Sequence, residues 1–186
     1  MIISISGNAG SGKSTVGKLL ATTLGFKRYY MGQLRRDMAK KRGMTINEYN
    51  KLGETDPSTD TEVDEYQTEL GNKEDNFVIE GRTSFHFIPH SIKVFLSVSI
   101  DEAAKRIFKD LKENTDRNEQ VFASVEDLKK SIFEREKSDE KRYLSHYGFS
   151  HLDLSKYDLV IDTTNISPEE VVDKIIKFVK REKGNI

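Results

Sequence analysis

Cysteine is absent from this chain of 186 residues. Its absence excludes disulfide bonds, thiolate nucleophiles and zinc sites with sulfur ligands. Long apolar runs are also missing, and none approaches the length that spans a membrane. The first expected strand begins at residue 2, which leaves no space for a signal peptide. We therefore expect a cytoplasmic protein without a membrane partner.

An excess of charge of one sign is also lacking. The chain carries 30 basic and 31 acidic residues, so its formal net charge is −1. A surface that binds nucleic-acid phosphates normally carries net positive charge, so we expect no nucleic-acid partner. Internal repeats and low-complexity linkers are absent too. The length predicts a single domain over residues 1–186, which we expect to act as a monomer.

A glycine-rich motif stands close to the N-terminus. Gly7 and Gly12 are separated by four residues and followed by lysine and a hydroxyl residue. Glycines let the backbone curl around a phosphate, so that successive N–H groups point inward as an anion site. Lys13 can then reach the β- and γ-phosphates of a nucleoside triphosphate, and the Ser14 hydroxyl can ligate Mg²⁺. The residues expected to bind the nucleotide are Gly7, Asn8, Ala9, Gly10, Ser11, Gly12, Lys13, Ser14 and Thr15.

The residues on either side of this motif fit a strand and a helix. Residues 2–6 form a short β-branched run that is typical of a buried parallel strand. After Lys13, apolar residues recur at helical spacing until Gly25, which can end a helix. The loop therefore leads into a helix N-terminus, where unpaired N–H groups and the helix dipole favour phosphate.

The rest of the chain alternates strands with helices. Further strands are expected at residues 26–30, 77–80, 92–98 and 158–162. Helices are expected at residues 32–41, from 99 onwards, at 125–147 and from 167 onwards, with a loop at 81–91. This alternation predicts an α/β fold in which helices cover both sides of a parallel sheet. Ligands of such a sheet bind at the carboxyl ends of its strands.

A helical insertion of about residues 43–76 is expected between the second and third strands. Thr45 and Glu48 match a capping box, which marks the start of a helix. Asp56-Pro57 can begin another helix, because proline is favoured at the first helical position. We expect that helix to end at Gly71.

A second departure from the alternation is the segment of about residues 112–124. Its residues are polar and lack a helical or strand period, so we expect a mobile segment. The core of the domain is then expected at residues 1–42 and 77–186.

A triphosphate site also needs an acidic group near the metal ion, and two strand ends offer one. Glu80 ends the third expected strand and Asp162 ends the last. We favour Glu80, because a strand next to the first strand can face the metal, whereas the last strand of such a chain usually lies further out. Arg82 follows closely and can add a fork for phosphate. Asp162 is expected to be a turn residue.

Arginines are a second group of candidate site residues, because phosphoryl transfer needs positive charge around phosphates that repel each other. The candidates are Arg35, Arg36, Arg82, Arg106, Arg117, Arg135 and Arg142. Arg135, Asp139 and Arg142 share one face of the long expected helix, since they are spaced four and three residues apart. Taken alone, this pattern favours a solvated face with ion pairs.

These segments together resemble the P-loop nucleoside monophosphate kinases, and most closely the cytidylate kinases of the archaeal type. The resemblance covers nearly the whole chain. Its main stretches are Met31-Gly32-Gln33-Leu34-Arg35-Arg36, Glu80-Gly81-Arg82, residues 135–143 and residues 157–163. It implies a P-loop NTPase three-layer fold with a five-stranded parallel sheet, a helical monophosphate-binding insertion and a short lid at about residues 110–124. It also implies the reaction ATP + CMP ⇌ ADP + CDP, with Mg²⁺ as cofactor and dCMP as a second acceptor.

The resemblance also implies roles for individual residues. Arg36 would hold the acceptor phosphate, and Arg106 would act on the donor side where the lid begins. Arg135, Asp139 and Arg142 would hold the base, ribose and phosphate of the acceptor, which reverses the preference for a solvated face. Arg117 would lie in the lid. The residues expected to act in catalysis are Lys13, Arg36, Arg82, Arg106, Arg135 and Arg142, and those expected to bind the acceptor are Arg36, Arg82, Arg135, Asp139 and Arg142.

Three other functions fit the same motifs. The fold could act on UMP or another monophosphate, or it could phosphorylate a small metabolite such as a sugar or a shikimate-like acid. Acceptors without phosphate would not require so many convergent arginines. The third alternative is a regulatory module that binds ATP without turnover.

Overall fold

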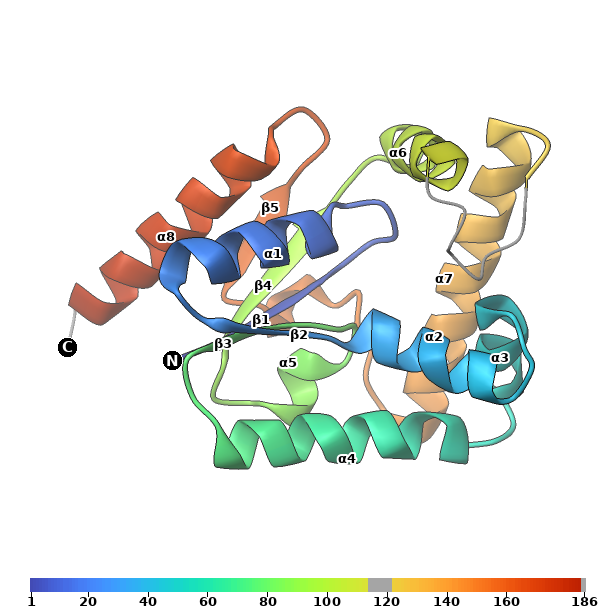
Figure 1. The fold of residues 1–186 in the computed structure, drawn as a ribbon, viewed down its shortest axis with the longest axis horizontal. Coiled ribbons are helices and arrows are strands. Elements are labelled where there is room, and N and C mark those ends of the chain that lie inside the picture. The colour runs from blue at the N-terminus through green and yellow to red at the C-terminus, as the bar shows by residue number, and fades with distance from the viewer. Residues whose placement is uncertain (114–121, 185–186) are drawn as a thin grey trace.

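In the computed structural model, which describes residues 1–113 and 122–184, five strands form one parallel sheet (Figure 1). The strands are β1 (Ile2–Gly7), β2 (Lys27–Tyr30), β3 (Phe77–Glu80), β4 (Ile92–Ser97) and β5 (Leu159–Asp162). Their order across the sheet is β2-β3-β1-β4-β5, so β1 is central and β5 lies at an edge. All neighbouring pairs run parallel, which confirms the predicted α/β fold.

Helices cover both faces of this sheet. They are α1 (Lys13–Leu24), α2 (Met31–Lys41), α3 (Ile46–Leu52), α4 (Ser58–Lys73), α5 (Ser84–Phe87), α6 (Ile100–Glu113), α7 (Val125–Tyr147) and α8 (Pro168–Gly184). A short 3₁₀ turn at Leu154–Lys156 precedes β5. In Figure 1, α1 and α8 lie on one side of the sheet, and α4 and α5 lie on the other. Among the described residues, no helix is both long and apolar enough to cross a lipid bilayer.

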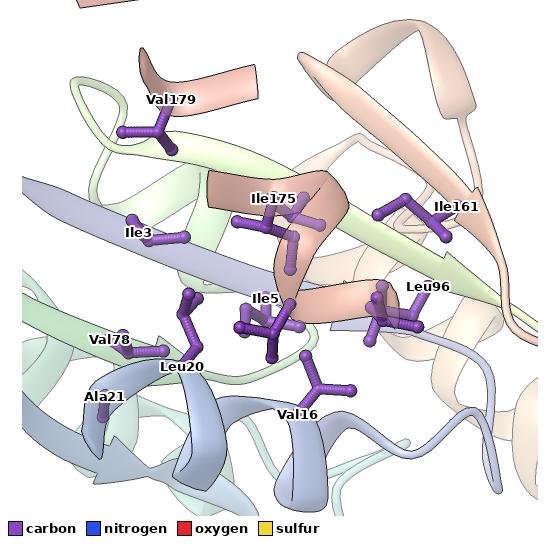
Figure 2. Packing of buried hydrophobic residues seen from close by; sticks show 13 residues of the cluster. Ile3, Ile5, Val16, Leu20, Ala21, Val78, Leu96, Ile161, Ile175 and Val179 are labelled. Atoms are coloured by element: carbon purple, nitrogen blue, oxygen red, sulfur yellow. The ribbon is translucent and has the colours of Figure 1, made fainter. Parts of the chain in front are cut away.

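The hydrophobic core divides between the two faces of the sheet, because side chains alternate along a strand. Ile3 and Ile5 of β1 pack with Leu20 of α1 and Ile175 of α8 (Figure 2). Ile2 faces the other way, into a second cluster with residues of α2, α3 and α4. Burial on both faces explains why the strand residues 2–5 are almost all apolar.

The insertion is helical, as its caps predicted. Thr45 and Glu48 form the complete capping box at the start of α3. The Ser58 N–H donates to Asp56 Oδ1 at 3.0 Å, so the aspartate satisfies one N–H group at the start of α4. Pro57, which was expected as the first helical residue, is instead the residue just before the helix. Short local spacings of this kind are visible in the sequence, because both partners lie within one helical turn.

The predicted end of α4 at Gly71 is wrong, since the helix continues to Lys73. A Cβ at Gly71 would lie 3.0 Å from Ile88 Cγ2, so glycine permits close packing of α4 on the segment before β4. Gly71 therefore allows a tertiary contact and does not end the helix.

The structure extends the expected helices in two places. The predicted loop at 81–91 contains the short helix α5, whose Phe85 is buried against Phe95 of β4. The helix α6 continues to Glu113 and so includes the first residues of the expected lid. The following lid residues 114–121, with Arg117, lie outside the described residues.

Candidate active site

The glycine-rich loop runs from the end of β1 to the start of α1. Gly10 and Gly12 have φ angles of 73° and 83°, which residues with a Cβ rarely adopt. A Cβ at Gly10 would lie 2.8 Å from the Ala103 Cα, so α6 can approach the loop only because this residue is glycine. Since helix N-termini present N–H groups without helical partners, the loop has the geometry of an anion site.

Lys13 folds back over this loop. Its Nζ donates to the Gly7 carbonyl at 2.8 Å and to the Asn8 carbonyl at 2.6 Å. Burial, together with the charges of Arg82 and Arg135, lowers the pKa of Lys13 to about 7. An anion beside Nζ would raise this pKa, because it would stabilise the charged ammonium.

Glu80 ends β3, the neighbour of β1, and only 1 % of it is exposed. Arg28 donates to it through Nε at 2.5 Å and Nη2 at 3.1 Å, and Nη2 also donates to the Ser14 carbonyl. A Cβ at Gly17 would lie 2.1 Å from Glu80 Oε1, so the carboxylate packs directly against α1. Burial raises the pKa of Glu80, and the Arg28 guanidinium opposes this. Nothing in the sequence indicated the pairing with Arg28.

Asp162, the other metal candidate, lies at the end of the edge strand β5. It is exposed, and its Oδ1 accepts from the Thr164 N–H at 2.9 Å and from the Thr164 hydroxyl at 2.6 Å. These bonds close a tight turn after the strand. The expected turn role of Asp162 is therefore confirmed.

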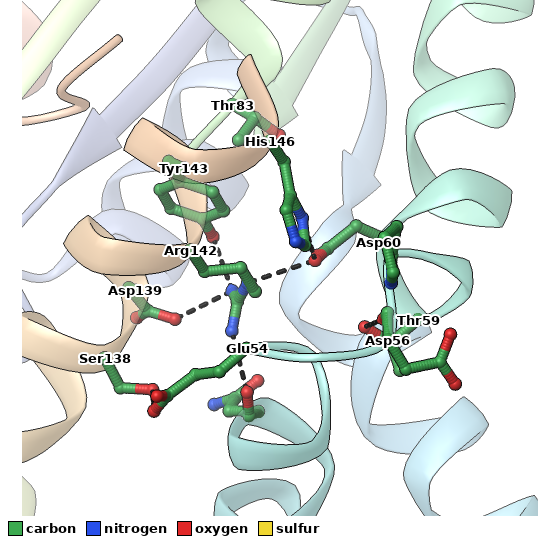
Figure 3. Close-up of polar contacts among 12 residues, drawn as sticks. Glu54, Asp56, Thr59, Asp60, Thr83, Ser138, Asp139, Arg142, Tyr143 and His146 are labelled. Atoms are coloured by element: carbon green, nitrogen blue, oxygen red, sulfur yellow. Dashed lines mark hydrogen bonds and ion pairs between the residues drawn. The ribbon is translucent and has the colours of Figure 1, made fainter. Parts of the chain in front are cut away.

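Asp139 and Arg142 of α7 are buried, with exposed fractions of 2 % and 1 %. Figure 3 shows Arg142 at the centre of a polar cluster. Its Nε lies 3.0 Å from Asp60 Oδ2, and its Nη1 donates to the Asn50 carbonyl at 3.2 Å. Its Nη2 donates to Asp139 Oδ1 at 2.8 Å and to the Tyr143 hydroxyl at 3.0 Å. The interpretation of this face as solvated is wrong, because the ion pairs lie inside the protein.

The charges in this cluster hold one another in their ionised forms. Burial would raise the pKa of Asp139, but Arg82 and Arg142 outweigh burial and hold it at about 2. Burial would lower the pKa of Arg142, yet Tyr143, Asp139 and Asp60 raise it above its usual value. Removing one partner would therefore leave an uncompensated charge inside the protein.

Arg82 and Arg135 approach the same place from different elements. Arg82 follows β3 and forms an ion pair with Asp139 Oδ2. Arg135 lies one helical turn before Asp139 and lines the same cavity as Lys13. The fold therefore brings the end of β3 and the middle of α7 to the glycine-rich loop.

Neighbouring arginines of α2 point to different partners. Arg36 Nη2 donates to the Tyr30 hydroxyl at 2.7 Å. Arg35, which was only one candidate among seven, donates to Asn50 Oδ1 at 2.7 Å and forms an ion pair with Asp60. Both arginines line the cavity. Arg35 links α2 to the insertion through these contacts, and the sequence did not predict this role.

Arg106 of α6 is held at the opposite edge of the sheet. Its Nη2 donates to the Thr163 carbonyl at 2.7 Å and to the Thr164 carbonyl at 3.2 Å, and its Nε donates to Glu102. The side chain still lines the cavity beside the glycine-rich loop. This placement is compatible with the expected donor-side role.

A cavity of about 500 Å³ joins these groups, a size typical of ligand sites. The predicted residues in its wall are Ala9, Gly10, Ser11, Gly12, Lys13, Ser14, Thr15, Arg36, Glu80, Arg82, Arg106, Arg135, Asp139 and Arg142. Gly7 and Asn8 are not in the wall, and their carbonyls instead hold the Lys13 ammonium.

The polar residues of this wall that were not predicted as site residues include Asn50, Asp60 and Asp64. Asp60 pairs with two arginines, and Asp64 accepts a hydrogen bond from Tyr147. Burial raises the pKa of Asp64 to about 7. The spacing of Asp60 and Asp64 by four residues could have indicated a shared helix face.

Comparison with known proteins shows what the whole chain is similar to. The profile of the Cytidylate kinase-like family matches residues 2–165. A cytidylate kinase of Pyrococcus abyssi is 42 % identical over 172 residues, which cover 92 % of this chain and 89 % of the relative. A cytidylate kinase of Methanococcoides burtonii is 34 % identical over 180 residues, covering 96 % and 97 %. The shikimate kinase structure from Acinetobacter baumannii, with a TM-score of 0.60 and 18 % identity over 98 % of this chain and 94 % of its own, shares the fold.

Proposed function

The chain belongs to the cytidylate kinase-like family, and from this premise we propose that its cavity holds ATP and CMP side by side. It is a phosphotransferase that forms ADP and CDP from these two nucleotides. The observation that carries the proposal is the single cavity in which the glycine-rich loop and Lys13 meet the buried cluster of Arg82, Asp139 and Arg142. An acceptor without phosphate would have no use for that concentration of guanidinium groups.

Positioning and charge stabilisation would supply the catalysis. The loop and Lys13 would bind the β- and γ-phosphates, with Arg106 on the donor side. Arg36, Arg82, Arg135 and Arg142 would neutralise the acceptor phosphate, which otherwise repels the γ-phosphate. Four contacts already engage Arg142, so its main contribution is expected to be the field of its charge. No general base is needed, because a phosphate oxygen of the acceptor is already a nucleophile.

The available oxygen donors fit Mg²⁺. The Ser14 hydroxyl and the Glu80 carboxylate both line the cavity. Among residues 1–113 and 122–184, no group of three or more histidine or acidic side chains could hold a metal alone. This fits Mg²⁺, which usually keeps several waters and takes phosphate oxygens with one or two protein ligands. Bound there, it would withdraw charge from the transferred phosphoryl group.

An acceptor panel tests the function directly. ADP formation would be measured with CMP, dCMP, UMP, AMP and shikimate, each at a range of concentrations. We expect CMP to give the highest kcat/KM and dCMP to follow. Arginines already engage both Asp139 oxygens, so binding of the acceptor should depend little on a hydrogen bond from its 2′-hydroxyl to Asp139. A higher value for AMP or shikimate would contradict the proposal. ATP binding without acceptor-dependent ADP formation would instead indicate a regulatory module.

Glu80→Gln is expected to raise the Mg²⁺ concentration for half-maximal activity by roughly tenfold, because a carboxylate near the cation is lost. Asp162→Asn is the matched control, since Asp162 lies on the edge strand and only closes a turn. A magnesium titration of both variants measures the effect. Glu80→Gln also weakens a buried pair with Arg28, so thermal unfolding would be followed separately. The reverse ranking of the two variants would assign the role to Asp162.

A further inference from the structure

Two side chains contact the Arg82 guanidinium at Nη1, and one of them is a histidine that no motif singled out. We infer that His151 is a positioning residue, whose neutral imidazole accepts a hydrogen bond from Arg82 and orients that guanidinium in the wall of the cavity. His151 lies in the segment between α7 and β5 and is fully buried. Its Nε2 is 3.5 Å from Arg82 Nη1. The inference rests on the proposed function, in which Arg82 acts on phosphate.

The chemistry of the two neighbours determines which imidazole nitrogen carries the proton. A guanidinium can only donate hydrogen bonds, so Nε2, which faces Arg82, must be the acceptor. In the neutral ring the hydrogen is then on Nδ1, which lies 3.1 Å from the Glu140 carboxylate but is not aligned with it as a hydrogen bond. One neutral tautomer therefore gives Arg82 its acceptor and places the remaining N–H beside a carboxylate. A doubly protonated ring would direct an N–H group at Arg82 and would lose this contact.

The surroundings of His151 keep the ring neutral and fixed. Burial and the charge of Arg82 lower the pKa of His151 to about 3, so it stays uncharged near neutral pH. The Tyr143 ring meets it edge-on with centroids 5.1 Å apart. The Tyr157 hydroxyl donates to the His151 carbonyl at 2.8 Å, which anchors the backbone. A ring held in this way can define where its partner points.

Two acceptors therefore meet the same nitrogen of Arg82, Nη1. Asp139 pairs with its guanidinium from α7, and His151 meets it from the segment that follows α7. The side chain of Arg82 is 14 % exposed, so most of it is enclosed while it still lines the cavity. Both contacts are made at Nη1, so Asp139 and His151 together can engage the two hydrogens of that nitrogen and restrict rotation of the planar group. Holding a reacting group in one orientation is a recognised source of rate enhancement.

Two polar replacements separate positioning from packing. His151→Asn keeps a donor near the place of Nδ1, facing Glu140, but its side chain is too short to reach Arg82. His151→Gln is one methylene longer and can present its carbonyl oxygen near the place of Nε2. We expect kcat/KM for CMP to fall roughly tenfold in His151→Asn and to be largely kept in His151→Gln. The exposed His90 supplies the control His90→Asn, which is expected to match the wild type.

A double-mutant cycle completes the test. In an Arg82→Met background, His151→Asn is expected to cause no further loss in kcat/KM, because there is no guanidinium left to orient. The KM for ATP is expected to stay within about twofold in each variant. Equal losses in Asn and Gln variants, or a loss that persists in the Arg82→Met background, would overturn the inference in favour of a packing role. So would wild-type kinetics in His151→Asn.

Failure of the inference can be told apart from failure of the proposed function. If Arg82→Met itself has wild-type kcat/KM for CMP, the inference is overturned, because Arg82 then has no kinetic role for His151 to support. CMP phosphorylation by the wild-type protein would still stand in that case. If the wild type shows no CMP-dependent ADP formation, the proposed function fails and the inference fails with it.

Discussion

Replacing Lys13 by alanine is expected to lower kcat by at least two orders of magnitude while leaving the protein folded. The loss is large because Lys13 would act on charge that develops in the transition state, where removal of one preorganised donor typically costs about 10²–10³ in kcat. Folding should survive, because Lys13 Nζ donates to acceptors of the loop itself, namely the Gly7 and Asn8 carbonyls and, at 3.5 Å, the Ser11 hydroxyl. A coupled assay for ADP and circular dichroism measure the two properties.

The control for this variant is Lys18→Ala. Lys18 lies on the same helix, α1, but is exposed to solvent. The Lys18→Ala variant loses one positive charge but keeps every group of the cavity, so its kcat is expected to stay near the wild-type value. Near-normal turnover in Lys13→Ala would contradict the assignment of the glycine-rich loop. Equal losses in both lysine variants would point to a general charge effect.

Replacing Asp139 by asparagine is expected to lower kcat/KM for CMP by about ten- to a hundredfold with little change in ATP binding. The carboxylate holds Arg82 with one oxygen and Arg142 with the other. Asparagine has nearly the same shape but no charge and only one acceptor oxygen, so both ion pairs are lost and one of the two guanidiniums faces an amide N–H₂ group. Kinetics with CMP varied and a direct ATP-binding titration separate the acceptor side from the donor side.

The same variant is expected to be less stable by about 3–5 kcal/mol at neutral pH, because buried positive charges are left uncompensated. Glu134→Gln is the matched control, since Glu134 is an exposed carboxylate on the same helix and is expected to change stability by less than about 0.5 kcal/mol. Urea unfolding measures both. Equal stability of Asp139→Asn and the wild type would show that the cluster is not held by charge.

The stabilisation from Asp139 should also depend on pH. Its pKa is about 2 in the folded protein, against 3.8 for an ordinary aspartate. Because the folded pKa is the lower one, the contribution is complete above about pH 4 and is lost as the pH falls toward 2. The gap in unfolding free energy between the wild type and Asp139→Asn should therefore narrow by about 2 kcal/mol over that range. A gap that is constant with pH would contradict the folded-state pKa.

The features that the sequence determined by itself depend on residues that are close together in the chain. The glycine-rich loop, the strand before it and the helix from Lys13 to Leu24 follow from residues that are close in the chain. The capping box of Thr45 and Glu48 and the bounds of α7 follow for the same reason. Alternation of these elements was sufficient to predict the parallel sheet and to prefer Glu80, on the strand beside β1, over Asp162 at the edge.

Tertiary structure alone decided which charged groups meet. Arg142 and Asp60 form a pair although their residue numbers differ by 82, and Arg82 contacts His151 although their numbers differ by 69. A helical period shows that Asp139 and Arg142 share a face, but it cannot show whether water or another helix lies against that face. Burial is set by how distant elements pack. An exposed ion pair contributes little to stability, whereas removing one member of a buried cluster leaves an uncompensated charge and is strongly destabilising. The pairing of Arg28 with Glu80, the passage of α4 beyond Gly71 and the neutral state of His151 all depend on such packing.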